Sequence, residues 1–378
     1  MRILLSPDKF KGSLSSDRIC TIIDQRIKEK LGSHVVINKH PMADGGDGSL
    51  KVLAQFIPFE KIFKEVKDPI GETIDACYCV HKKTAYIELA IASGIANVAP
   101  SNRNPRLTST YGTGQLINDA IEKGCNQILL FLGGSCTNDA GVGIASALGF
   151  NFLDSTGNAL EAIGDNLYHI DRIEYKGTHD FKSIEIQILC DVTNPLYGPN
   201  GAAHVYGKQK GASPEDILYL DKGLVKIAQL FKNYSGIDVQ TIPGTGAAGG
   251  IGAGLMTLCN AQLVGGFEML SKITELSNAV KESDIIISGE GRIDDSSFQG
   301  KVIGGVFNLT QKYNKELILV CGVYDHDSTT IRDTQLPIFE ISAYSKNLED
   351  AMLNAEQYLL KCCDKIVEYI KEDKGIKE

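Results

Sequence analysis

Apolar residues recur at two spacings along the chain, and each spacing predicts a different element. Residues 2–6 form a short apolar run that is typical of a buried strand. The segment after it begins near Ser15 and carries isoleucines on one helix face, at positions 19, 22, 23 and 27. The same order of strand and helix is predicted for residues 35–56 and again after residue 283. Both ends of the chain are therefore predicted to be built from βα units.

The middle of the chain follows another pattern. Residues 59–91 alternate between short runs of β-branched or aromatic residues and turn residues, which predicts an antiparallel meander. Helix and strand signals alternate from about residue 113 onward. We therefore expect an α/β protein in which a discontinuous parallel-sheet core domain, residues 1–66 and 283–378, holds an inserted mixed α/β domain, residues 67–282.

A long helix is predicted at the carboxyl end of the chain. Its apolar residues recur at alternating spacings of three and four from Leu348 to Ile370. This spacing places them on one helix face, so we expect the whole segment to cover one face of the core sheet.

Composition and charge exclude several classes of protein. The net charge of −9 over 378 residues argues against a nucleic-acid binder or a protein held on a membrane by a basic patch. The start of the chain resembles no signal peptide, and no apolar run reaches about 18 residues, so we expect a cytoplasmic protein with no membrane partner. The ten cysteines match no metal-ligand spacing, which predicts structural thiols.

Six glycine-rich or charged loops each follow a predicted strand. They read "SPDKFKGSL", "ADGGDG", "GGSCTNDAG", "CDVTNPLYG", "GTGAAGGIGAG" and "SGEGRIDDSSFQGK". The last of these, residues 288–301, follows the apolar run at residues 283–287. Ligands of open α/β sheets bind at the carboxyl ends of the strands, so the six loops predict one shared cleft.

The loop "GGSCTNDAG" suits a phosphate. Gly133 and Gly134 let the backbone approach an anion, and Thr137, Asn138 and Asp139 are good caps for the helix that follows. Helix capping alone is the structural alternative, and it requires one of the last two residues but neither glycine.

Two other kinds of protein remain open at this point. Residues 244–249 spell G-x-G-x-x-G, with Glu268 nineteen positions past Gly249, so an NAD-dependent dehydrogenase is one alternative. The run of glycines continues beyond the motif, which favours an anion-binding or closely packed helix start instead. A regulator that binds a small acid without catalysis is the other alternative.

The charged residues of these loops suit phosphoryl transfer, which needs cations on the moving phosphate and carboxylates that hold Mg²⁺ or accept a proton. Candidate cations are Lys9, Lys11, Lys208, Lys210, Arg292 and Lys301. Candidate acids are Asp8, Asp44, Asp47, Asp139, Asp191, Glu290, Asp294 and Asp295.

Two of these residues are assigned specific roles. Asp191 closes an apolar strand and is the preferred general base, although an Asx cap on the turn before Pro195 would explain it equally simply. Asp294 and then Asp44 are the alternative bases. Arg292 is expected to bind a carboxylate or a phosphate, because its guanidinium group can donate two parallel hydrogen bonds.

Seven motifs in one order across nearly the whole chain resemble the bacterial type-I glycerate kinase family. They are "SPDKFKGSLS", "ADGGDG", "GGSCTNDAG", "CDVTNPLYGPNGAA", "GKQKGAS", "PGTGAAGGIGAGL" and "SGEGRID" with "QGK". The resemblance implies ATP-dependent phosphorylation of D-glycerate with Mg²⁺, usually to 2-phosphoglycerate. It also implies a Rossmann-like core with an inserted second domain. One departure is Asp47, where the family often has glutamate.

The resulting site prediction is a cleft between the two domains that binds D-glycerate, ATP and Mg²⁺. Catalytic roles fall to Asp191, Lys11 and Arg292, and substrate binding to Asp8, Asp44, Asp47 and Asp294. The predicted metal ligands are Asp191 and Glu290. The predicted nucleotide or phosphate ligands are Gly133, Gly134, Ser135, Thr137, Asn138, Asp139, Lys210, Gly246 and Gly249. The phosphorylated hydroxyl, the loops that hold adenine, and a homodimeric state are left open.

Overall fold

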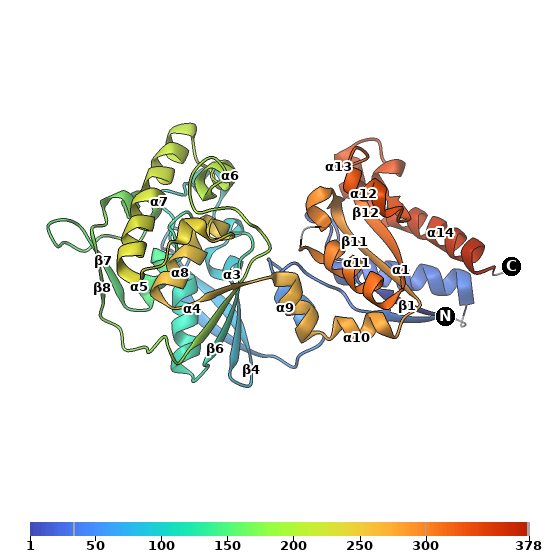
Figure 1. The fold of residues 1–378 in the computed structure, drawn as a ribbon, viewed down its shortest axis with the longest axis horizontal. Helices are drawn as coiled ribbons and strands as arrows, with labels where there is room; N and C mark the ends of the chain where they lie inside the picture. The colour runs from blue at the N-terminus through green and yellow to red at the C-terminus, as the bar shows by residue number, and fades with distance from the viewer. Residues whose placement is uncertain (33–34, 299, 376–378) are drawn as a thin grey trace. The chain divides into compact units, whose positions relative to one another are not determined.

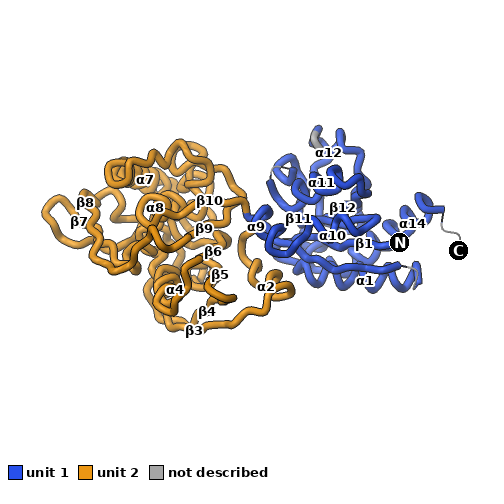
Figure 2. The backbone as a smooth tube through the Cα atoms, turned by 60° about the horizontal axis from the view of Figure 1, so that its bottom comes forward, with its two compact units in different colours: residues 1–44, 266–378 blue, residues 45–265 orange. Residues whose placement is uncertain are grey.

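The chain folds into two units, which Figure 2 shows in different colours. The computed structural model describes residues 1–32, 35–298 and 300–375. Unit 1 consists of residues 1–44 and 266–378, and unit 2 consists of residues 45–265. Unit 1 therefore takes its chain from both ends of the sequence.

The unit boundaries lie earlier than the sequence pattern predicted. Helix α2 (Ser49–Leu53) belongs to unit 2, where the Leu50 amide donates to a carboxylate oxygen of Glu88 over 2.8 Å. Helix α9 (Gly266–Ile273) belongs to unit 1, where the ring of Phe267 occupies the space beside Gly305. These contacts join residues far apart in sequence, so local periodicity does not show them.

Unit 1 is built on a parallel five-stranded sheet with the order β13-β12-β11-β1-β2. The chain winds from β1 to β2 on one side and from β11 to β13 on the other. The direction of winding therefore reverses between β1 and β11, and such a switch point is where α/β sheets bind ligands. The strands are β1 (Arg2–Leu5), β2 (Val36–Lys39), β11 (Ile285–Ile293), β12 (Glu316–Tyr324) and β13 (Ile338–Glu340).

Two long amphipathic helices of unit 1, α1 (Ser16–Leu31) and α14 (Ala355–Lys374), lie side by side in Figure 1. They share one apolar cluster with alternate residues of β1 and β11, such as Ile3 and Ile285. The Ser15 side chain caps α1, close to where the sequence predicts that the helix begins. The other helices of unit 1 are α9, α10 (Leu276–Lys281), α11 (Val302–Tyr313), α12 (Thr329–Thr334) and α13 (Leu348–Leu353).

Strand β11 is longer than predicted. The predicted loop at residues 288–301 begins as strand, because β11 stays paired with β12 as far as Ile293. Gly289 permits this pairing, since a Cβ atom there would lie 1.8 Å from the carbonyl oxygen of Val320. The true loop begins at Asp294. Glu290 and Arg292 are therefore strand residues, and they share one face of the sheet.

The predicted single C-terminal helix is two helices. Helix α13 ends at Leu353, and α14 begins at Ala355. Residues of α14 face the core as predicted, whereas Leu348 of α13 is 67% exposed. The prediction that the whole apolar stripe covers a sheet face is wrong for α13.

Unit 2 contains a six-stranded mixed sheet with the order β10-β9-β6-β5-β4-β3. Strands β3 to β5 pair antiparallel, which confirms the predicted meander, and β5, β6, β9 and β10 are parallel. Strands β7 (Phe150–Leu153) and β8 (Arg172–Tyr175) form a separate hairpin. The strands of the large sheet are β3 (Glu60–Lys67), β4 (Thr73–His81), β5 (Thr84–Glu88), β6 (Gln127–Phe131), β9 (Glu185–Leu189) and β10 (Gln262–Val264).

The four parallel strands of unit 2 bring several loops to one edge of the sheet. The segments after β5, β6 and β9 all leave at the carboxyl ends of these strands. One extensive apolar cluster joins the sheet to the helices of the unit. These helices are α3 (Leu89–Ser93), α4 (Tyr111–Glu122), α5 (Val142–Ala147), α6 (Ala202–Tyr206), α7 (Pro214–Ser235) and α8 (Ile251–Leu258), and α2 also contacts β5.

All ten cysteines are free, and eight of them are buried. Burial raises the pKa of the eight buried thiols, and it raises that of the half-buried Cys190 to about 11, so the thiol is the dominant form at neutral pH. Among the residues that the structure describes, no helix has the length and apolar character needed to cross a membrane.

Candidate functional site

Unit 1 has a cavity of about 390 Å³ at the carboxyl end of its sheet, beside the switch point between β1 and β11. Three acids line it, and each lies at or near the end of a different strand. They are Asp8 after β1, Asp44 after β2, and Glu290 on β11. The structure therefore brings together three of the predicted site residues.

Two of these carboxyl groups are strongly perturbed. Burial raises the pKa of Asp8 well above its usual range, and the neighbouring charge of Asp44 raises it further. Burial also raises the pKa of Glu290 to about 7, against the opposing effect of a hydrogen bond from Ser297. One oxygen of Glu290, Oε1, has no hydrogen-bond partner among the described residues. Buried, perturbed acids that line a cavity are typical of a functional site.

The predicted cations Lys11 and Arg292 line the same cavity. Lys11 lies in an exposed turn after β1, and the side chain of Arg292 is 68% exposed. Nε of Arg292 lies 3.5 Å from Oδ2 of Asp294, an ion pair that leaves most of the guanidinium group accessible. Both cations are therefore available to an anionic ligand.

Asp294 has a local structural role. Its carboxylate accepts hydrogen bonds from the amide and the hydroxyl of Ser296, over 2.9 and 2.5 Å. These bonds lower the pKa of Asp294. The residue closes the turn that follows β11, a geometry in which aspartate is common.

The predicted phosphate loop lies after β6 in unit 2. A Cβ atom at Gly133 would lie 2.2 Å from the backbone nitrogen of Asp47, so this glycine is needed for close approach of the two loops. Asp47 itself is exposed and belongs to unit 2. The structure thus brings the "ADGGDG" and "GGSCTNDAG" loops together.

Lys210 is bonded to this loop from a distant part of the chain. The lysine is 2% exposed, and its Nζ donates to the carbonyl oxygen of Thr137 over 2.6 Å and to Oγ of Ser135 over 3.4 Å. Burial lowers the pKa of Lys210 to about 8. Three of the predicted phosphate ligands therefore form one cluster.

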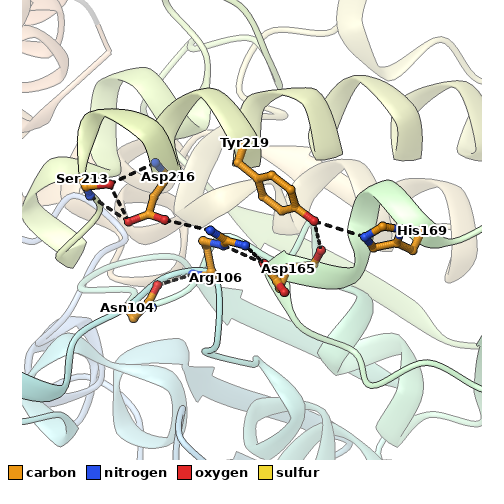
Figure 3. A network of polar contacts seen from close by, with 7 residues as sticks. All are labelled: Asn104, Arg106, Asp165, His169, Ser213, Asp216 and Tyr219. Atoms are coloured by element: carbon orange, nitrogen blue, oxygen red, sulfur yellow. Dashed lines mark hydrogen bonds and ion pairs between the residues drawn. The ribbon is translucent and has the colours of Figure 1, made fainter.

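The turn that carries Lys210 leads into α7, and a polar network fixes the start of that helix (Figure 3). Arg106 contacts carboxylate oxygens of Asp165 over 2.6 Å and of Asp216 over 3.1 Å. Its guanidinium carbon lies 4.2 Å from the ring centre of Tyr219, whose hydroxyl donates to the Asp165 carbonyl oxygen. Asp216 also forms a capping box with Ser213. Sequence reasoning missed Arg106, because its partners are far away in the chain.

Asp139 and Asn138 have different environments although both are fully buried. The Asp139 carboxylate accepts bonds from Thr110 and from the amides of Gly141 and Gly143, so the capping alternative explains it. Burial nevertheless raises the pKa of Asp139. The Asn138 amide has no hydrogen-bond partner for Nδ2 or Oδ1 within the described part of the chain. A buried amide in this state calls for a ligand or an ordered water.

The glycines at 244–249 serve close packing. A Cβ atom at Gly246 would lie 2.0 Å from the carbonyl oxygen of Pro195, and one at Gly249 would lie 2.2 Å from that of Thr137. A 3₁₀ turn at Val239–Thr241 precedes the loop, whereas a dinucleotide fingerprint follows a strand. The structure therefore gives no support to the dehydrogenase alternative.

Asp191 lies two residues beyond the end of β9 and is half-buried. Its neighbour Asn194 is occupied, because its amide donates to the carbonyl oxygen of Asn200 and accepts from the hydroxyl of Tyr206. Asn194 therefore fixes the turn through its own hydrogen bonds. Asp191 belongs to unit 2 and its predicted metal partner, Glu290, to unit 1.

Comparison with known proteins decides which family this arrangement represents. The sequence model described as the glycerate kinase family matches residues 3–371. The chain belongs to the glycerate kinase family. This confirms the resemblance seen in the seven motifs.

Relatives of the chain agree with this assignment over most of their length. It is 36% identical over 359 residues to a glycerate 2-kinase of Escherichia coli K12, with 94% of each chain covered. It is 39% identical over 327 residues to a glycerate kinase of Halalkalibacterium halodurans, with 85% of each covered. A crystal structure of a candidate glycerate kinase 2 from Salmonella typhimurium LT2 matches with a TM-score of 0.82 and 35% identity, over 100% of both chains. The predicted α/β fold class is thereby confirmed.

The glycerate kinase fold also places residues at the unit 1 cavity that sequence reasoning missed. An apolar wall also lines the cavity, and it comes from the segment after β13, from α13 and from the first residue of α14. The sequence held one sign of this wall, because the polar Asn354 interrupts the run of apolar residues at this point. The spacing of those residues nevertheless matches that of a helix that faces the core, so the sign was missed. The wall consists of Ile341, Leu348, Ala351, Met352 and Ala355.

Proposed function

We propose that this protein is an ATP-dependent kinase that phosphorylates D-glycerate at its 2-hydroxyl group. The observation that carries the proposal is the unit 1 cavity, where perturbed carboxyl groups and exposed cations meet at the switch point of a parallel sheet. Membership of the glycerate kinase family over residues 3–371 supports the choice of substrate. The Escherichia coli relative, a glycerate 2-kinase, supports the choice of hydroxyl.

The cations provide charge for the transfer. Arg292 and Lys11 would bind the carboxylate of glycerate or the phosphates of ATP, because both side chains are exposed and line the cavity. In unit 2, Lys210 and the Asn138 amide would bind phosphate oxygens at the edge of the second sheet. The reaction would therefore use side chains of both units. The predicted cleft between the domains stays a prediction.

The proton needs an acceptor. As the 2-hydroxyl oxygen bonds to the γ-phosphorus, the bond from that phosphorus to the β–γ bridging oxygen breaks and ADP leaves. We assign the hydroxyl proton to the carboxylate of Asp191, which lies beyond the end of a buried strand. Asp294 is the less suitable acceptor, because its carboxylate already accepts two hydrogen bonds from Ser296.

The donor chemistry fits Mg²⁺, which prefers oxygen ligands and usually takes one or two carboxylates together with substrate phosphates. Among the described residues, no three or more acids, histidines or cysteines form a ready metal site. One protein carboxylate beside the phosphates would suffice to hold the ion, and the predicted ligands are Asp191 and Glu290. When bound, Mg²⁺ supplies neutralisation of the phosphate charge.

A coupled assay of ADP release with and without D-glycerate tests the proposal. We expect ADP release that depends on D-glycerate, that stops with excess EDTA and that returns with added Mg²⁺. ³¹P NMR of the product should show 2-phosphoglycerate. Release of ADP at the same rate without glycerate, or none with it, contradicts the proposed activity, and 3-phosphoglycerate contradicts only the position of transfer.

A further inference from the structure

We infer that the cavity of unit 1 binds the adenosine part of ATP, with the base on the apolar wall and the ribose hydroxyls at the carboxyl groups. The inference rests on the proposed kinase function. Membership of the family does not say where adenosine binds, and the inference assigns it to this cavity. It also changes the role of Glu290 from the predicted metal ligand to a ribose acceptor.

The apolar wall does not suit glycerate. Leu348 and Met352 are 67% and 40% exposed although both are large apolar side chains that line the cavity. Glycerate has three carbons, two hydroxyls and a carboxylate, and offers such a wall almost no apolar surface. An adenine ring offers a flat apolar face on each side. Cavities that bind such ligands are lined mainly by apolar side chains with a few polar groups that fix orientation.

The acids that line the cavity suit hydroxyl groups. Asp8, Asp44 and Glu290 are acceptors when ionised, and a carboxylate placed against them would be repelled. A neutral ribose instead donates from two hydroxyls. Oε1 of Glu290 is buried and lacks a partner among the described residues, and the whole side chain is 9% exposed. Acceptance of a ribose hydroxyl by a carboxylate is the arrangement that nucleotide-binding α/β sheets use.

Size and position agree with this ligand. A volume of about 390 Å³ falls in the range of about 300 to 1,000 Å³ that is typical of sites for ligands larger than glycerate. The cavity lies at the switch point of the parallel sheet, where dinucleotide- and mononucleotide-binding folds hold their ligands. Lys11 and Arg292 line the same cavity and are exposed, so cations are present for the phosphates attached to the ribose.

The wall is fixed to the loop after β1. Oγ of Ser13 donates to the carbonyl oxygen of Met352 over 3.2 Å. Gly12 lies against the same residue, because a Cβ atom there would be 2.9 Å from Cε of Met352. The loop that carries Asp8 and Lys11 and the helix that carries the apolar wall are therefore held together.

The test uses a charge placed on the wall. Leu348→Asp should keep the fold, since the native side chain is 67% exposed, but it places a carboxylate where the base would pack. Leu353→Asp is the matched control, because Leu353 lies on the same helix, is 77% exposed and does not line the cavity. Adenosine and ATP binding are measured by calorimetry, and KM is measured for ATP and for D-glycerate.

We expect Leu348→Asp to weaken adenosine binding and raise KM for ATP by roughly tenfold or more, with KM for D-glycerate within about twofold of wild type. The control should match wild type in all three. A rise in KM for D-glycerate alone would assign the cavity to the acid and overturn the inference while the kinase function stands. Adenosine binding by Leu348→Asp at wild-type affinity would also overturn it. If wild type shows no glycerate-dependent ADP release, the proposed function fails, and the adenosine titration still reports on the cavity.

Discussion

Lys210 donates a hydrogen bond from Nζ to the carbonyl oxygen of Thr137 over 2.6 Å, although the lysine is 2% exposed. This bond joins the turn before α7 to the loop after β6. Its cost is visible in the pKa of Lys210, which burial lowers to about 8, against the smaller opposing effects of Cys136 and Asp139. The ammonium group is thus held in place at the expense of its hydration.

Replacing Lys210 by methionine should change how stability depends on pH. Between about pH 8 and 10.5 the unfolded chain holds a proton on Lys210 that the folded chain has lost, so this residue makes stability rise with pH in that window. The full effect is on the order of 3 kcal/mol. In Lys210→Met this rise is absent. The Tm of the variant minus that of wild type should therefore fall steadily as pH rises from 8 toward 10.5.

The two proteins share every other titrating group, so the difference in Tm isolates Lys210. Thermal unfolding of both at several pH values measures it. A difference that stays constant across the window would show that Lys210 titrates near its ordinary pKa and is hydrated in the folded protein.

Removal of Arg106 should destabilise unit 2. The side chain bridges Asp165 and Asp216 and stacks on Tyr219, so Arg106→Ala loses two ion pairs and a cation–π contact (Figure 3). Because the three partners are only partly buried, we expect a loss of about 1 to 2 kcal/mol. Urea unfolding provides the measurement.

A single exposed ion pair provides the control for Arg106. Lys226 pairs with Asp171, with side chains that are 42% and 41% exposed. Lys226→Ala should cost less than about 1 kcal/mol. Equal losses in the two variants would mean that the Arg106 network contributes no more than an ordinary surface pair.

The sequence predicted those parts of the fold that depend on local periodicity. The βα order at both ends and the meander at residues 59–91 follow from the spacing of apolar residues, and the structure has both. The extension of β11 through Glu290 and Arg292 could not be predicted in this way, because charged residues and glycines indicate a loop until β12 is known to pair with them. Pairing between distant strands overrode the local signal.

In the candidate site, too, the sequence predicts features that depend on local residues and misses those that depend on distant contacts. Charge and glycine content indicated the loops of Asp8 and Asp44, which follow β1 and β2, whereas Glu290 lies within β11. They could not separate glycines that approach a ligand from those that approach another loop, as Gly246 approaches Pro195. The apolar wall was hidden for a related reason, since the exposed side chain of Leu348 continues the spacing of a buried helix face.

Arg292→Lys should reduce activity without loss of stability. The Arg292 side chain is 68% exposed, and the ion pair that it forms with Asp294 is long at 3.5 Å, so folding depends little on it. Lysine keeps the charge and loses the planar pair of donors, which puts about 1.5 to 3 kcal/mol of charge-assisted bonding at risk. We expect kcat/KM to fall by roughly tenfold or more at an unchanged Tm. Kinetics within twofold of wild type would make Arg292 an ordinary surface residue.

Asp191→Asn tests the assignment of the proton acceptor or metal ligand. Asparagine has nearly the same shape and can still accept one hydrogen bond, so the turn after β9 should persist and Tm should stay near that of wild type. It cannot take up the hydroxyl proton, and it is a weaker ligand for Mg²⁺ than a carboxylate. We expect kcat to fall by roughly 10² or more, with little change in the affinity for D-glycerate. Single-turnover kinetics and equilibrium binding of D-glycerate separate these two quantities.

Asp294→Asn is the comparison, because we expect this variant to lose stability and Asp191→Asn to lose turnover. The Asp294 carboxylate accepts two hydrogen bonds from Ser296, and these bonds lower its pKa, so it stabilises the turn after β11 in its charged form. Loss of this carboxylate should reduce the free energy of unfolding by about 1 kcal/mol and so lower Tm, while kcat stays within a few-fold of wild type. The reverse pattern, with a lowered Tm and near-normal turnover in Asp191→Asn and a collapse of kcat in Asp294→Asn, would move the role of proton acceptor to Asp294.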